Sequence, residues 1–120
     1  MLAALAAATV LAAAPVKVTV TATGHTPPVG KRLNYSVSAK VGGKPVKALL
    51  TEQIIDPIGG VHSVTYGTTK KVIKNWRFTG VFRDFILWPA SSRGVPVTWR
   101  FIVVVGKTKH IVNYKITPKE

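Results

Sequence analysis

From residue 16 to the end of the chain, apolar and polar residues alternate with a period of two, and this alternation constrains the fold more than any other feature. It is clearest in the segments 16–21 (VKVTVT), 32–41 (RLNYSVSAKV) and 97–105 (VTWRFIVVV). Successive side chains of a strand point to opposite faces of a sheet, so an alternating segment buries one face. No segment after residue 14 repeats with the period of an amphipathic helix. The sequence therefore predicts an all-β fold.

Turn-forming residues divide this region into about seven strands. The turns are marked by Pro27-Pro28, Gly42-Gly43, the segment 57–60, the segment 90–94 and Gly106-Lys107. The expected strands cover residues 16–21, 32–41, 46–56, 61–66, 76–88, 97–105 and 111–116, and the basic stretch 67–74 is expected to be a loop. Short strands at this spacing are typical of an antiparallel β-sandwich. A small barrel is the alternative, because strand count alone does not separate the two.

Two segments carry a resemblance to a known fold type. Residues 29–60 (VGKRLNYSVSAKVGGKPVKALLTEQIIDPIGG) combine a strand, a glycine hairpin and a second strand ending in an Asp-Pro-x-Gly-Gly turn, and residues 96–117 (PVTWRFIVVVGKTKHIVNYKIT) supply a closing hairpin. In these features the chain resembles the immunoglobulin-like β-sandwich modules of exported bacterial proteins. The resemblance implies a spacer, surface-display or binding domain rather than an enzyme. The chain has no cysteine, so it lacks the Cys-Trp-Cys core of antibody-type domains, and the fold type has no shared site whose residues carry over.

The first 14 residues differ from the rest of the chain. MLAALAAATVLAAA is an uncharged Ala/Leu run that ends in small residues, as the apolar region of a secretory signal peptide does. It is too short to span a bilayer, which takes roughly 20 apolar residues. No Lys or Arg precedes it, and an N-terminal helix is the alternative. We expect a leader over 1–14 and one domain over 15–120, in a protein that is secreted or associated with the cell surface.

The charge of the chain indicates anionic partners. Lys and Arg number 17 against 4 Asp and Glu, for a formal net charge of +13. A field of this sign attracts polyanions, with a range of about 8–10 Å in physiological salt. We therefore predict that a monomeric domain binds an anionic cell-wall polymer or membrane surface with low specificity. The side chains expected to carry this binding are Lys44, Lys47, Lys70, Lys71, Lys74 and Arg77.

The same basic residues also have a simpler interpretation, since lysines on exposed strands prevent sheets from pairing edge to edge.

Sequence-specific binding of nucleic acids is not expected. No helix is predicted that could enter a DNA groove, and the aromatic residues fit core positions better than a stacking surface, which argues against sequence-specific nucleic-acid recognition. The aromatic residues expected in the core stand at alternate positions of their strands and are Trp76, Phe78, Phe82, Trp99 and Phe101.

Trp88 suggests a second function from a different class. It precedes Pro89 at the edge of a loop, where an exposed ring would offer a contact for a carbohydrate or a protein, as in an inhibitor or adhesin module. The competing interpretation is that a Trp-Pro pair at a sheet corner closes one end of the sandwich.

Catalytic and metal-binding patterns are sparse. The three histidines, His25, His62 and His110, are not spaced as metal ligands, and the sequence holds no thiol, no G-x-S-x-G elbow and no phosphate-binding glycine loop. The acids are Glu52, Asp56, Asp84 and Glu120. We expect Asp56 to order a turn before Pro57, and Asp84 to pair with Arg83, Arg77 or Arg100. No enzyme activity, cofactor or metal site is predicted, although a small enzyme or metal-binding protein using the histidines stays a third hypothesis.

Overall fold

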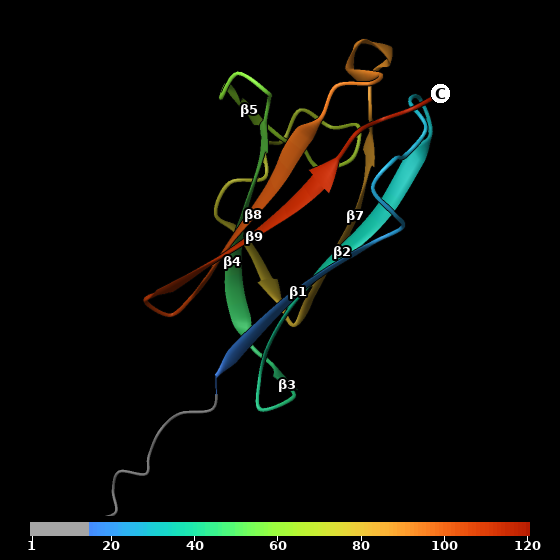
Figure 1. Cartoon of the computed structure of the whole chain (residues 1–120). Helices are drawn as coiled ribbons and strands as arrows, with labels where there is room; N and C mark the ends of the chain where they lie inside the picture. Colours follow the sequence, from blue (N-terminus) through green and yellow to red (C-terminus); the bar gives the residue numbers. More distant parts are fainter. Residues whose placement is uncertain (1–14) are drawn as a thin grey trace, which may run out of the picture.

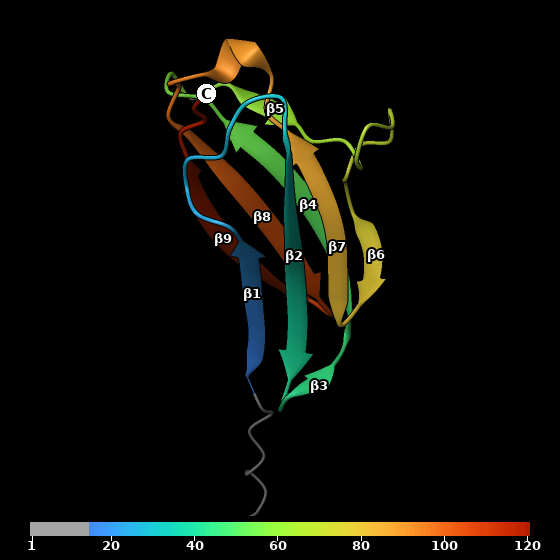
Figure 2. The ribbon, with the colours of Figure 1, turned by 90° about the vertical axis from the view of Figure 1, so that its right-hand side faces the viewer.

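The computed structural model describes residues 15–120 and consists of two antiparallel sheets packed face to face (Figures 1 and 2). The predicted leader, 1–14, lies outside the described residues. The strands are β1 (Val16–Ala22), β2 (Arg32–Val41), β3 (Lys44–Pro45), β4 (Lys47–Ile55), β5 (Val61–Ser63), β6 (Trp76–Thr79), β7 (Val81–Leu87), β8 (Val97–Val105) and β9 (Thr108–Ile116). A 3₁₀ turn, η2 (Ala90–Ser92), precedes β8. The predicted all-β sandwich is confirmed, with two separate sheets rather than a closed barrel.

The order of the strands in each sheet differs from their order in the sequence. In the first sheet β2 pairs with β1 on one side and with β7 and the short β3 on the other. In the second sheet β4 pairs with β8 on one side and with β5 and β6 on the other, and β9 follows β8 at the edge. Strands that are distant in sequence, β2 with β7 and β4 with β8, thus become neighbours, and the connections cross between the sheets.

The core lies between the two sheets and is built from the inward-facing side chains of each strand. On β2 and β8 every second residue is buried, which is the periodicity that the sequence predicts. Leu49-Leu50 and Ile54-Ile55 are apolar at successive positions, so alternation alone does not assign the buried face of β4, and the structure does. Leu50 is fully buried and Ile54 packs against the core, so Leu49 and Ile55 occupy the outward phase of the strand.

One predicted strand is divided by a glycine. The alternation from residue 76 to 88 belongs to two strands in different sheets, because β6 pairs with β4 while β7 pairs with β2. Gly80 joins them with a φ of 76°, and a Cβ at this position would lie 2.7 Å from the Cβ of Pro45. Its N–H donates to Val46 O and its C=O accepts from Ala39 N. Glycine is required here because a side chain fits neither the left-handed backbone nor the available space.

Candidate functional site

The six cations expected to bind anions lie in three parts of the molecule. Lys44 belongs to β3, which pairs with β2 in the first sheet. Lys70 and Lys71 lie in the connection between β5 and β6, where Tyr66 N donates to Lys71 O and a bridge joins residues 65 and 72. Lys74 stands just before β6. These four side chains are exposed, and they do not share a pocket with one another.

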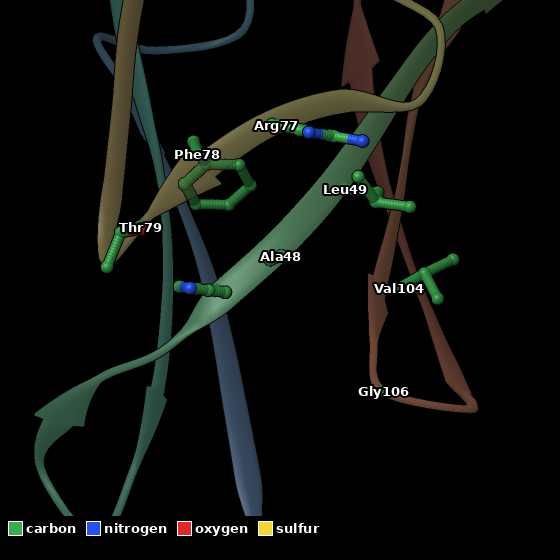
Figure 3. Close-up of a pocket in the computed structure, with 8 residues that line it drawn as sticks. Ala48, Leu49, Arg77, Phe78, Thr79, Val104 and Gly106 are labelled. Atoms are coloured by element: carbon green, nitrogen blue, oxygen red, sulfur yellow. The ribbon is translucent and has the colours of Figure 1, made fainter.

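Lys47 and Arg77 are the two that the fold brings into one site. They line a groove of about 500 Å³ on the outer side of the second sheet (Figure 3). Leu49 of β4 pairs in register with Arg77 of β6 on one side and with Val104 of β8 on the other. Figure 3 shows the Arg77 side chain extending toward Leu49, while Phe78 points away from it. The groove therefore has an aliphatic floor with cations along one side.

The row of residues that crosses the groove ends in a cation on each side of the sheet. It runs from Arg77 through Leu49 and Val104 to Lys109 of β9, each in direct register with the next. With neighbouring strands about 4.8 Å apart, the backbones of Arg77 and Lys109 are separated by roughly 14 Å. Lys109 was not among the expected site residues. The sequence predicted the last strand over 111–116, whereas β9 begins at Thr108, and the register of β9 against β8 could not be read from the sequence.

The basic side chains are not neutralised by acids. In the part of the chain that the structure describes, the one ion pair within 4 Å joins His62 and Asp56, at 2.7 Å, and it includes no Lys or Arg. The four acids of the sequence lie away from the groove, since Glu52 is in the core, Asp56 is in a turn, Asp84 contacts the core and Glu120 ends the chain. The outer face of the second sheet is consequently free of carboxylates.

Asp56 organises the turn after β4, as the sequence predicts. Its Oδ1 accepts hydrogen bonds from the backbone N–H groups of Ile58, at 3.0 Å, and Gly60, at 2.7 Å. Its Oδ2 lies 2.7 Å from His62 Nε2. The hydrogen bond with His62, followed by that from Gly60, lowers the pKa of the Asp56 carboxyl below its ordinary value of 3.8. The turn holds Ile58 outward, almost fully exposed.

Two carboxyl groups and an aromatic pair form a polar cluster between the sheets. Glu52 is 1% exposed, and its Oε2 lies 2.6 Å from Tyr35 Oη while its Oε1 accepts from Trp99 Nε1 at 2.9 Å. Tyr35 Oη is also 3.3 Å from Asp84 Oδ2, which accepts from Gly67 N at 3.1 Å. The expected ion pair of Asp84 with an arginine is therefore wrong, because the inward phase of β7 directs this carboxyl to Tyr35 instead.

Burial governs the chemistry of this cluster. Loss of solvation raises the pKa of the Glu52 carboxyl to about 8 from an ordinary value of 4.5, against the opposing effect of the hydrogen bonds with Tyr35 and Trp99. Burial likewise raises the pKa of Tyr35 well above its ordinary value. The sequence could not place Glu52 in this cluster, because the apolar pairs Leu49-Leu50 and Ile54-Ile55 leave the buried face of β4 unassigned. The protonation state of an acid buried in this way affects the stability of the core.

Trp88 closes one end of the sandwich. Its ring is 3% exposed and packs edge-on against Trp99, with the ring centroids 5.7 Å apart. A second groove, of about 560 Å³, lies at this end and includes Trp88 among its lining residues. The hypothesis of an exposed aromatic platform at Trp88 is wrong, because the ring fills the space between the sheets where β7 ends. The competing interpretation, a Trp-Pro corner, describes the observed position.

Two further features of residues 15–120 complete the description. No group of three or more His, Asp or Glu side chains is placed there to hold a metal ion. No helix in this part of the chain is long and apolar enough to cross a membrane.

Comparisons with models of protein families, with curated proteins and with solved structures found no match. The function must therefore be inferred from the geometry of this chain.

Proposed function

We propose that this domain is a non-catalytic binding module that holds anionic polymers or anionic surfaces through the outer face of its second sheet. One observation carries the proposal. Lys47 and Arg77 come from different strands and meet in a single groove that no carboxylate lines. An anion that enters the groove meets two positive charges at once, and Lys109 stands in register across the same row.

The electrostatics of the whole chain support this site. No Lys or Arg among residues 15–120 forms an ion pair with a carboxylate, so their charges stay available to a ligand. A net charge of +13 steers polyanions toward the molecule, and their binding releases counterions. Such binding has low specificity and weakens steeply as salt is added.

Protection of sheet edges is the competing explanation for these cations, because Arg77 lies on β6 and Lys109 on β9, which are edge strands of the second sheet. The predicted leader over 1–14 would export the domain to a compartment that contains anionic polymers and membrane surfaces. We propose secretion or attachment to the cell surface on that ground.

A heparin column eluted with a salt gradient tests the proposal. The protein is compared with the double variant Lys47→Glu and Arg77→Glu, and with a matched control, Lys31→Glu and Lys119→Glu. The control makes the same change in net charge at exposed residues outside the groove. We expect the groove variant to elute at clearly lower salt than the control. Equal elution of the two variants would mean that the retention reflects net charge, and the proposed site would be rejected.

The loop cations are tested in the same experiment. Lys70→Glu with Lys71→Glu changes the net charge by the same amount in the connection between β5 and β6. Elution of this variant together with the control would assign the binding to the groove. Elution at the salt concentration of the groove variant would extend the binding surface to this loop.

A further inference from the structure

The outer face of the second sheet carries aliphatic side chains where a solvated face is normally polar. Four of them are contiguous, because Leu49 pairs with Val104, Ile102 pairs with Ile111, and Ile102 and Val104 share the outward phase of β8. We call these four residues the aliphatic strip. Ile111 is 54% exposed. The outward faces of antiparallel sheets usually carry polar residues, so the strip is unusual for a face that meets only water.

The first sheet provides an internal comparison. The corresponding outward positions on β1 and β2 carry mainly hydroxyl and amide side chains: Thr19, Thr21, Asn34, Ser36 and Ser38. Both faces belong to the same molecule and are built from strands of similar length. The outward apolar residues of the first sheet, Val81, Phe85 and Leu87, all lie on one strand, β7. The strip differs because it spans three neighbouring strands, β4, β8 and β9, and a continuous apolar area of this kind points to a partner with an apolar layer.

Cations surround the strip. Arg77 and Lys47 lie on the side of β6, Lys109 lies on the side of β9, and Arg100 occupies the outward phase of β8 beside Ile102. A second copy of this face is a poor partner, because pairing would bring these like charges together with no carboxylate to offset them. A partner that complements this face offers an apolar layer to the aliphatic strip and, next to it, a negatively charged layer to the surrounding cations.

We propose that the outer face of the second sheet docks on the surface of an anionic lipid bilayer. The aliphatic strip enters the boundary between headgroups and acyl chains, and the surrounding cations contact the lipid phosphates. This inference rests on the proposed function and names the partner. A polymer in solution offers the charges but no apolar layer in which to bury Ile111.

The expected contributions are of similar size for the two parts of the face. A Lys or Arg near an anionic membrane surface strengthens binding by about fivefold. Withdrawal of one exposed aliphatic side chain from the apolar layer is expected to weaken binding by roughly five- to tenfold. Replacing a strip residue should therefore weaken binding to vesicles and leave binding to a soluble polyanion unchanged.

Vesicle sedimentation with the full chain tests the inference. The vesicles consist of phosphatidylcholine alone or of phosphatidylcholine mixed with phosphatidylglycerol. Ile111→Thr removes apolar surface from the strip and keeps a β-branched side chain suited to a strand. The matched control is Ile58→Thr, the same change at a more exposed isoleucine outside the strip. All proteins carry the same residues 1–14, so differences in binding report the changed position.

We expect binding to the anionic vesicles only, a several-fold loss for Ile111→Thr and no loss for Ile58→Thr. Elution of Ile111→Thr from heparin should not change. Equal vesicle binding by the two isoleucine variants would overturn the inference. Retention on heparin that depends on Lys47 and Arg77, without binding to vesicles, would also overturn it and leave the proposed function standing with a polymer as partner. If the groove variant and its control behave alike on both materials, the proposed function fails as well.

Discussion

Replacing Glu52 with glutamine exchanges one buried oxygen for nitrogen and tests which protonation state holds the core together. Because burial raises the pKa of this carboxyl to about 8, Glu52 keeps its proton at neutral pH. Its O–H then donates to Tyr35 Oη, which lies 2.6 Å away, and Tyr35 donates onward to Asp84. The glutamine amide can make the same contacts. The free energy of unfolding of Glu52→Gln at pH 5 should thus lie within about 1 kcal/mol of the unchanged protein.

The sign of the pH dependence follows from the two pKa values. The ordinary value of 4.5 applies to the unfolded chain, and the folded value is about 8. Between them the unfolded chain has lost the proton that the folded protein keeps, so the free energy of unfolding falls as pH rises, by about 1.4 kcal/mol per pH unit. The contribution is complete below pH 4.5 and is lost above pH 8. Its total is on the order of 5 kcal/mol, a large part of the stability of one domain.

Urea unfolding at a series of pH values from acid to mildly alkaline measures this slope. The difference between the unchanged protein and Glu52→Gln isolates Glu52, because every other titrating group is shared. We expect the two curves to meet near pH 5 and the variant to be increasingly the more stable at higher pH. A variant that is several kcal/mol less stable already at pH 6 would show that Glu52 is ionised in the fold, and the reasoning would be refuted.

Two further predictions concern the turns. Gly80→Ala should lower the free energy of unfolding by about 2–4 kcal/mol, because alanine is strained at a positive φ and its Cβ would clash with the Cβ of Pro45. The control is Gly94→Ala, at a similar φ of 75° but with open space around the Cβ. It should lower the free energy of unfolding by less in the same urea titration. A loss for Gly94→Ala as large as that for Gly80→Ala would contradict the role given to the close contact. Asp56→Asn should flatten the acid limb of stability, since a lowered folded pKa stabilises the protein above pH 3.8 and the benefit is lost below it. Thermal unfolding at a series of acidic pH values checks this, and an unchanged acid limb would show that the contacts of Asp56 with His62 and Gly60 do not stabilise the folded state.

The class of the fold and the buried faces of β2 and β8 were determined by the sequence alone. Alternation is a local property, so the buried phase of β2 and of β8 follows from the order of residues without knowledge of any partner strand. Turn chemistry is equally local, and it placed the turns at Gly42-Gly43 and Asp56 correctly. The expected return strand after Gly42-Gly43 pairs with β2 only over β3, and β4 lies in the second sheet. The leader over 1–14 is a prediction from the sequence alone.

The tertiary structure decided which residues meet. The separation of β6 from β7 at Gly80 depends on Pro45, which approaches from another part of the chain, and no local pattern reports that approach. Lys47 and Arg77 share a groove because β4 and β6 pair in one particular register, whereas Lys44, only three residues before Lys47, enters the other sheet. The physical reason is that strand pairing and sheet packing join residues far apart in the chain. Period and composition describe each segment by itself, and only packing determines which segments become neighbours.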